Sequence, residues 1–177
     1  VPLRVHVEQM LRAYQDQWQR HRRADSPVLA AAFAHLLKNI PPSEAPPTIV
    51  HGDASLRNLL IDNGQASGLL DWEIWHLGDP NEDLAYCRAD VEQAMPWAEF
   101  LAAYKQHGGV AEFSDAAGAY YGLFGAIRNA VFGVTILDGF ETAEQPGTTS
   151  AFAALYLARK LIADVGSQLL RAQGAAA

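Results

Sequence analysis

The 177-residue chain lacks several features that mark common classes of protein. Its one cysteine, Cys87, can form no internal disulfide and cannot by itself build a cysteine zinc site. Lys and Arg number 13 against 20 Asp and Glu, and the net charge of -7 disfavours a nucleic-acid binder that depends on a general basic field. No run approaches the roughly 18 continuous apolar residues of a membrane helix, and the first residues show no apolar signal segment. We therefore expect a cytoplasmic protein with neither a nucleic acid nor a membrane as partner.

The composition is that of a globular domain. Half of the residues are hydrophobic and 19% are charged, which excludes a disordered or fibrous chain. The length corresponds to one domain of roughly 100 to 200 residues, enough to bury a real core. One domain overall is expected.

The first part of the chain has the pattern of helices. Apolar residues spaced three and four apart predict a helix over 7–20, and Ser26 followed by Pro27 predicts the start of a second helix that runs to residue 38. Four prolines then fall within residues 41–47, where they exclude a helix. Residues 1–47 are therefore expected to be a helical segment with a proline-rich connector.

The period of the pattern changes beyond the connector. Alternation predicts short strands over 48–51, 58–62 and 66–71, and Asn63-Gly64 joins the last two as a hairpin. An irregular stretch through residues 78–80 precedes the remaining segments, which predict helices over 81–88, 96–106, 116–137 and 150–171. The expected fold of 48–177 is mainly α with a small β-hairpin insertion, an α+β arrangement.

Unusual polar residues gather in the β insertion. A strand, a polar loop and a hairpin should bring Asp53, Asn58 and Asp71 to one rim, because Asn58 opens the strand with which the strand before Asp71 pairs. Carboxylate and amide oxygens suit Mg²⁺, which is usually shared with substrate phosphates. A carboxylate left off the metal could accept a proton from an attacking hydroxyl.

Three motifs in this region resemble those of a known family. The sequence from His51 to Asn58, HGDASLRN, is similar to the H-x-D-x-x-x-x-N catalytic loop of the aminoglycoside phosphotransferases, which are small-molecule kinases related to protein kinases. Asp71-Trp72-Glu73 resembles the kinase D-F-G metal site, and the stretch from Gly78 to Ala85, GDPNEDLA, resembles a third family motif. The resemblance implies the helical C-terminal lobe of the kinase-like fold.

It also implies a reaction and a role for each matching residue. The γ-phosphoryl group of ATP would pass to a hydroxyl of a small-molecule substrate, with Asp53 as catalytic base and with Asn58 and Asp71 holding the Mg²⁺ and its nucleotide. His51 would support the loop rather than react.

Two further acids have supporting roles by the same resemblance. Asp83 would brace the catalytic loop through backbone contacts, with a plain helix first-turn acid as the alternative. Glu73 would be either a water-mediated neighbour of the metal or a solvated acid.

The chain departs from the family pattern in two ways. Ser55 and Leu56 replace a frequent His-Pro pair, and Arg57 stands where glycine is common. No glycine-rich loop with a strand lysine precedes the catalytic motif, so the N-terminal lobe that covers ATP is absent from these residues. We therefore expect a catalytically incomplete C-terminal lobe whose open face could form a homodimer.

Other notable residues receive structural interpretations. Trp72 and Trp75 are expected to pack in the core rather than stack on a substrate. His76 and His107 are expected at the surface or at helix ends, and Cys87 as a small buried side chain rather than a nucleophile.

Two alternative functions remain at this point. His51, Asp53 and Asp71 could bind a transition metal in a metallohydrolase, although the further histidines usual in such sites are missing. The chain could also be a non-catalytic kinase-like binding module that acts through contact with a partner.

Overall fold

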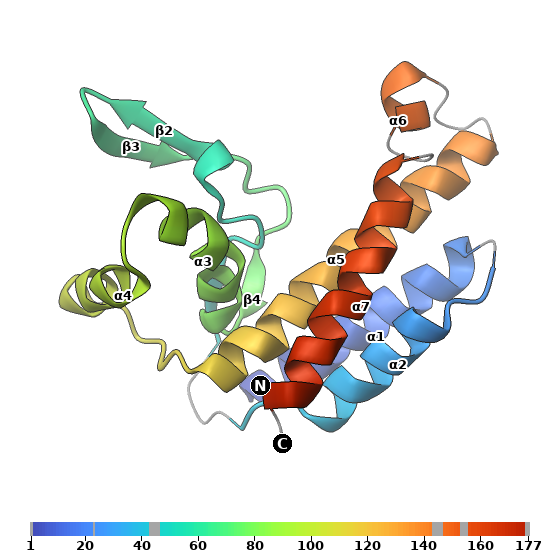
Figure 1. Cartoon of the computed structure of the whole chain (residues 1–177), viewed down its shortest axis with the longest axis horizontal. Helices are drawn as coiled ribbons and strands as arrows, with labels where there is room; N and C mark the ends of the chain where they lie inside the picture. The colour runs from blue at the N-terminus through green and yellow to red at the C-terminus, as the bar shows by residue number, and fades with distance from the viewer. Residues whose placement is uncertain (1, 23, 43–46, 143–146, 153–155, 176–177) are drawn as a thin grey trace.

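The structure, a computed structural model, describes residues 2–22, 24–42, 47–142, 147–152 and 156–175. Figure 1 shows a group of long helices on one side and a smaller part with two β-ribbons on the other. The long helices are α1 (Leu3–His21), α2 (Pro27–Lys38), α5 (Asp115–Glu141) and α7 (Ala158–Ala175), and the short α6 (Thr148–Phe152) lies beyond the end of α5. The smaller part holds β1 (Thr48–Val50), the 3₁₀ turn η1 (Leu56–Asn58), β2 (Leu59–Asp62), β3 (Gln65–Leu69), β4 (His76–Gly78), α3 (Asn81–Ala94) and α4 (Trp97–Gln106).

Helix α5 is the central element of the helical group. It packs against α7, α1, α2 and α3, and twelve of its residues are buried. A helix that is apolar on most of its circumference belongs inside a core. Its length and composition would also allow it to cross a membrane, but 61% of its most apolar window is buried within this fold. Burial against the neighbouring helices therefore accounts for its hydrophobicity.

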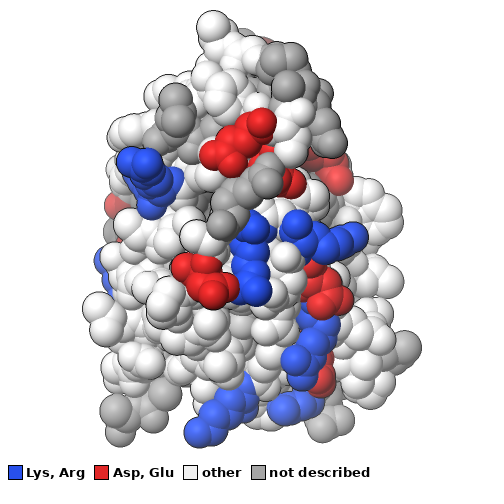
Figure 2. Space-filling view, turned by 90° about the vertical axis from the view of Figure 1, so that its right-hand side faces the viewer, with Lys and Arg blue, Asp and Glu red and all other residues white. Residues whose placement is uncertain are grey.

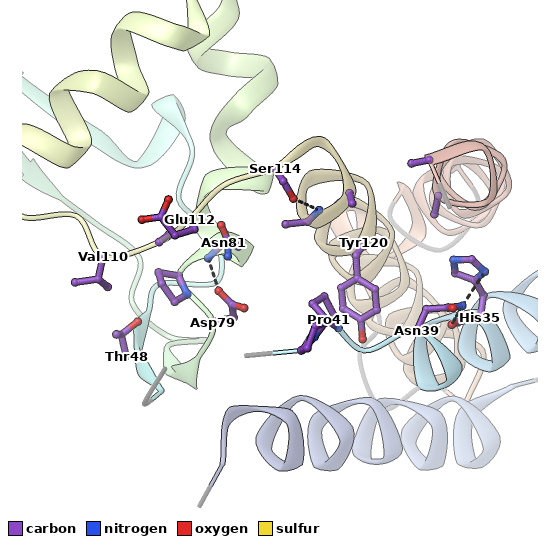
Figure 3. A pocket seen from close by; sticks show the side chains of 17 residues that line it. His35, Asn39, Pro41, Thr48, Asp79, Asn81, Val110, Glu112, Ser114 and Tyr120 are labelled. Atoms are coloured by element: carbon purple, nitrogen blue, oxygen red, sulfur yellow. Dashed lines mark hydrogen bonds between the residues drawn. The ribbon is translucent and has the colours of Figure 1, made fainter. Parts of the chain in front are cut away.

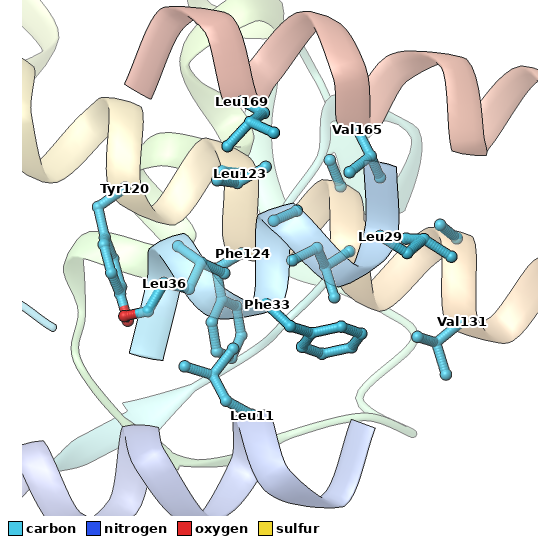
Figure 4. Close-up of a cluster of buried hydrophobic side chains, with 14 of the residues drawn as sticks. Leu11, Leu29, Phe33, Leu36, Tyr120, Leu123, Phe124, Val131, Val165 and Leu169 are labelled. Atoms are coloured by element: carbon cyan, nitrogen blue, oxygen red, sulfur yellow. The ribbon is translucent and has the colours of Figure 1, made fainter. Parts of the chain in front are cut away.

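The core lies between these helices. Leu11 from α1, Phe33 from α2 and Phe124 from α5 are at most 1% exposed and face one another in Figure 4. Trp18 stacks on Phe33 with ring centroids 5.7 Å apart. Burying one side chain of this size contributes roughly 1.5–3 kcal/mol, so the core fixes the helices relative to one another.

Serine caps begin two of these helices. The Ser26 hydroxyl accepts a hydrogen bond from the Leu29 N–H at 3.3 Å, and Pro27 occupies the first helical position, as the sequence predicts. The Ser114 hydroxyl accepts from the Ala117 N–H at 3.1 Å and caps α5.

The β part consists of two separate two-stranded ribbons. β2 and β3 form the predicted hairpin, and Asn63 and Gly64 take the positive φ angles of 50° and 78° that a tight turn of this kind requires. β1 pairs with β4 in antiparallel register, with Thr48 opposite Gly78. The sequence analysis missed β4, because three residues are too few to show an alternating pattern.

Several predicted boundaries are wrong by a few residues. Strand β1 ends at Val50, Asn58 belongs to η1 rather than to a strand, and β3 ends at Leu69. Helix α3 continues to Ala94, and the predicted last helix corresponds to α6 and α7. Of the predicted connector over 41–47, residues 43–46 lie outside the described residues.

Three aromatic predictions are also wrong. Trp72 and Trp75 are 45% and 56% exposed, so they are not core residues. His76, expected at the surface or at a helix end, is instead partly buried, and its Nε2 lies 3.0 Å from the Glu82 Oε2. His107 does follow the last turn of α4 as its C-terminal cap, as predicted, and Cys87 is partly buried.

Acidic and basic side chains are mixed on the face formed by the long helices. In Figure 2, which looks onto the right-hand side of Figure 1, blue and red groups alternate over a mostly uncharged surface. This face carries no continuous field of one sign.

Candidate active site

The HGDASLRN segment forms a loop that leaves β1 and returns through η1. Gly52 has a φ angle of +85°, and a Cβ atom there would lie 3.0 Å from the Ile74 carbonyl oxygen. Glycine is therefore required twice, by the backbone conformation and by the close approach of residue 74. The sharp bend directs the chain from β1 to Asp53, whose side chain is 25% exposed.

His51 holds the loop from within. It is 2% exposed, its Nδ1 accepts a hydrogen bond from the Asp53 N–H at 3.1 Å, and its Nε2 lies 2.8 Å from the Leu70 carbonyl oxygen. Because Nδ1 accepts, the hydrogen of a neutral ring must be on Nε2, where it donates to Leu70. Both ring nitrogens of His51 are thus engaged with backbone groups of the loop and of Leu70.

Asp83 contacts the same loop from the first turn of α3. Its two carboxylate oxygens accept hydrogen bonds from the His51 N–H at 2.7 Å and from the Gly52 N–H at 2.9 Å. Charge-assisted bonds of this kind are short and strong. The predicted bracing contact is therefore present as two backbone hydrogen bonds.

Asp53 and Asn58 lie side by side across the loop. The Asn58 Nδ2 donates to the Asp53 Oδ2 and to the Asp53 carbonyl oxygen, both at 2.9 Å. Neither bond uses the amide oxygen of Asn58, which is the atom that would bind a metal. Arg57, where the family commonly has glycine, places its Nη2 3.8 Å from the Asp53 Oδ1, but its side chain is 76% exposed.

Asp71 follows the hairpin two residues after β3. The Leu70 N–H donates to the Asn58 carbonyl oxygen at 2.7 Å, so Asp71 adjoins a residue bonded directly to Asn58. Asp71 is exposed and has a φ angle of +67°, a left-handed conformation that few non-glycine residues adopt. Glu73 is also exposed.

These groups suit Mg²⁺ better than a transition metal. Asn58 and Asp71 offer an amide oxygen and a carboxylate, hard ligands that leave most positions to water and phosphate oxygens. Within the described residues, no group of three or more His, Cys, Asp or Glu side chains could hold a metal. The metallohydrolase alternative therefore has no ligand cluster in this part of the chain.

The sequence analysis missed two residues of α3 that contact the loop. Burial, together with hydrogen bonding to Asp53 and the charge of that carboxylate, raises the pKa of Tyr86. Asp90 accepts a hydrogen bond from the Leu56 N–H at 3.0 Å. Tyr86 is three residues after Asp83 and Asp90 seven after it, so helical spacing from the family motif could have found both.

A buried charge network, also missed, lies beneath the site. The Arg128 Nη1 and the Glu82 Oε1 are 2.8 Å apart, and these residues are 1% and 3% exposed. The other Glu82 oxygen lies 3.0 Å from the His76 Nε2, and the Arg128 guanidinium sits 5.1 Å from the centre of the Tyr86 ring. The network links β4, α3 and α5 directly behind the catalytic loop.

The fold and the loop together define a class: a mainly helical lobe of the phosphotransferase type. Residues 3–121 match the model of the phosphotransferase enzyme family, abbreviated APH. This match covers more than half of the chain, and the chain belongs to that family.

A solved structure has the same fold. The crystal structure of a candidate aminoglycoside phosphotransferase from Ralstonia eutropha superposes with a TM-score of 0.76 and 18% sequence identity, over 95% of this chain and 55% of that one. The chain therefore spans about half the length of this neighbour.

Short matches occur in much longer curated proteins. Acyl-CoA dehydrogenase family member 10 from Mus musculus is 35% identical over 74 residues, which are 39% of this chain and 7% of that protein. Acyl-CoA dehydrogenase family member 11 from Homo sapiens is 31% identical over 72 residues, 40% of this chain and 9% of that protein. The chain thus resembles one small region of each of these proteins.

Proposed function

We propose that this chain carries the catalytic loop of an ATP-dependent phosphotransferase that moves the γ-phosphoryl group to a hydroxyl of a small molecule. The observation that carries the proposal is the Asp53–Asn58 pair, joined at 2.9 Å on a loop whose backbone Asp83 holds. Family membership supports the phosphotransferase class.

Asp53 is the proposed base. Its carboxylate is fixed by Asn58 yet partly exposed, so an acceptor hydroxyl can reach it. As the hydroxyl oxygen bonds to the γ-phosphorus and the bond from that phosphorus to ADP breaks, the hydroxyl proton passes to Asp53. No covalent enzyme intermediate is needed, and positioning supplies much of the rate.

Asn58 and Asp71 are the proposed Mg²⁺ ligands. The amide oxygen of Asn58 and the exposed carboxylate of Asp71 present hard donors on neighbouring segments. The ion, when bound, neutralises charge on the phosphate groups. Glu73, two residues after Asp71, is proposed to reach the ion through water.

We further propose that this lobe is catalytically incomplete by itself. These 177 residues contain no glycine-rich loop with a strand lysine for the phosphates, and the chain matches 55% of its structural neighbour. Leu70, Trp72 and Trp75 on the segment after the hairpin are between 45% and 56% exposed. We propose that either an ATP-covering lobe or a second copy of this chain, in a homodimer, covers this surface. We also propose that the protein is cytoplasmic.

Mg²⁺-nucleotide binding tests the metal assignment. In a preparation that includes an ATP-covering lobe, Asp71→Ala should abolish Mg²⁺-ATP binding measured by calorimetry, because that carboxylate carries the charge that holds the ion. Asp62→Ala, an exposed aspartate on β2 of the same hairpin, is the matched control and should bind normally. Unchanged Mg²⁺-ATP affinity in Asp71→Ala would show that the ligand assignment is wrong.

The non-catalytic binding module remains the alternative. The guanidinium of Arg57 beside Asp53 favours it, because a cation there could compete for the carboxylate that must accept the proton. Turnover of a hydroxylated substrate by a preparation with both lobes, lost in Asp53→Asn, separates the enzyme from the binding module.

A further inference from the structure

A cavity lies at one end of the lobe, and none of the residues of the HGDASLRN loop lines it. Its volume is about 510 Å³, within the range of small-molecule sites. Figure 3 shows Thr48 and Asn81 on one side of it and Asn39 and Tyr120 on the other. The ends of α2 and α7, the start of β1 and the first turns of α3 and α5 surround it.

The direction of β1 separates this cavity from the active site. Thr48, at the start of β1, lines the cavity and pairs with Gly78. Val50, at the other end of the strand, leads into His51 and the catalytic loop. The two sites therefore lie at opposite ends of the same strand, and a ligand in the cavity would not occupy the acceptor position at Asp53.

The cavity wall includes the carboxylate of Asp79, whose described hydrogen-bond partners are neutral groups. Asp79, 5% exposed, accepts hydrogen bonds from the Asn81 N–H and the Tyr121 hydroxyl, both at 2.9 Å. Burial and the neighbouring Asp79 raise the pKa of Tyr121, so both of these donors are neutral. Glu112 also lines the cavity, but its carboxylate is paired with the Lys105 ammonium group, so the charge that counts here is that of Asp79.

Several backbone donors around the cavity are already used. At the start of α3, the Asn81 and Glu82 N–H groups bond to the side chain and to the carbonyl oxygen of Asp79. At the start of α5, the Ala117 N–H bonds to Ser114. These three N–H groups at the starts of the two helices are therefore not free to bind an anion.

Acceptors, by contrast, remain available. Helix α7 ends at the cavity with Ala172 and Ala175, and the carbonyl groups of a last helical turn have no partners within the helix. Among the described residues, the buried Asn81 Oδ1 and Thr48 Oγ1 have no hydrogen-bond partner. The Thr48 hydroxyl can donate or accept, but the Asn81 Oδ1 can only accept, so a matching ligand must donate a hydrogen bond there. The Asp79 carboxylate, bonded only to neutral donors among the described residues, favours a positively charged donor.

We propose that this cavity binds a compact organic cation, an ammonium group on an apolar body. The body lies against alanine and proline side chains of the wall, which include Pro41, Ala111 and Ala117. The ammonium group lies on the side of Asp79 and Asn81. This site needs no ATP and no second lobe, so it stands independently of the proposed phosphotransfer.

Three probes with one ring and different polar ends test the ligand class. The full chain is titrated with 2-phenylethylammonium, 2-phenylethanol and phenylacetate, followed by backbone amide NMR shifts. The ammonium should shift the amide signals of Asn81, Ala111 and Ala117. The alcohol should bind at least about tenfold more weakly, because it brings no positive charge to the Asp79 carboxylate. Phenylacetate should not bind. Equal binding of the ammonium and the alcohol, preferred binding of phenylacetate, or shifts confined to other residues would overturn the proposal.

A matched pair of alanine variants tests the location. Ala117→Phe, which fills the cavity, should abolish ammonium binding, whereas Ala102→Phe on the exposed face of α4 should leave it unchanged. Unfolding temperatures show whether both variants fold. If Ala117→Phe is folded and binds like the original chain, the proposal is wrong, and if it does not fold, the amide shifts in the original chain decide.

Discussion

The helical group and the β-ribbon part are ordered by different forces. In the helical group, side chains such as Leu11, Phe33 and Phe124 are at most 1% exposed and pack together without polar partners. In the ribbon part, neither ribbon has more than two strands, and the backbone of the catalytic loop is held by polar side chains, chiefly His51 and Asp83. The comparison teaches that apolar packing holds the helices in place, whereas a few individual hydrogen bonds hold the backbone of the HGDASLRN loop in place.

The largest loss of stability should come from the buried ion pair that joins the two parts. Glu82→Ala leaves the Arg128 guanidinium buried and unpaired, and we expect the free energy of unfolding to fall by about 3–5 kcal/mol. Urea unfolding of the variant and of the original chain measures this difference in free energy. The control is Glu92→Ala, which breaks a pair with Arg88 that is about 40% exposed and should cost less than about 1 kcal/mol. Equal losses in the two variants would contradict the assignment of the buried pair as the link.

A smaller loss is expected when the loop is released but the core stays intact. Asp83→Asn weakens two charge-assisted bonds to the loop backbone and should lower the free energy of unfolding by about 1.5–3 kcal/mol. Asp90→Asn, which touches one exposed backbone N–H of the same loop, is the control and should cost less than about 1 kcal/mol. Amide hydrogen exchange at His51 and Gly52 should rise in the first variant alone, and unchanged exchange there would argue against bracing.

The pH dependence of stability tests His76. Burial alone would lower its pKa, but the hydrogen bond and charge of Glu82 and the Ile74 carbonyl outweigh burial, so the pKa of His76 is raised above 6.5. The protonated ring therefore contributes stability that is fully present below the unfolded value of 6.5 and lost as the pH rises through the folded pKa. The advantage of the original chain over His76→Gln should therefore shrink as the pH rises above 6.5. If the stability advantage of the original chain over His76→Gln grew as the pH rose, the pKa of His76 would not be raised, and the prediction would be wrong.

The smallest effects are expected at the two exposed tryptophans of the ribbon part, Trp72 and Trp75. The Trp72 Nε1–H donates to the Leu69 carbonyl oxygen at 2.8 Å, and its ring lies 4.5 Å from that of His51. Trp72→Phe keeps an aromatic ring but loses the hydrogen bond, and should cost about 0.5–1.5 kcal/mol in urea unfolding. Trp75→Phe, at a more exposed position, should cost less. A larger loss in the free energy of unfolding for Trp75→Phe than for Trp72→Phe would contradict this prediction.

The same division explains how much the sequence predicts. Helices such as α1 and α2 follow from apolar spacing and from the Ser26 cap, because these signals are local and repeat over many residues. The hairpin follows from Asn63-Gly64, since few residue pairs adopt the required φ angles.

Pairings between distant residues were not predictable in this way. β4 has three residues, and its partner β1 lies almost thirty residues earlier. The bond of Arg128 to Glu82 joins residues 46 positions apart, so neither the ion pair nor the burial of His76 leaves a local pattern. At the site, the family motif points to Asp53, Asn58, Asp71 and Asp83, whose roles stay predictions. Tyr86, three residues after Asp83 on the same helix, was missed.

The central claim is that Asp53 acts in the reaction and not in the fold. In a preparation that includes an ATP-covering lobe, Asp53→Asn should keep its affinity for ATP, because the amide can occupy the same position beside Asn58. Its turnover should fall by roughly 10² or more, the usual cost of losing a general base. Calorimetry and a coupled ADP assay on the same preparation measure both quantities. Separation of binding from turnover is the predicted result, and a parallel loss of both would show that Asp53 is structural and that the kinase interpretation of this loop is wrong.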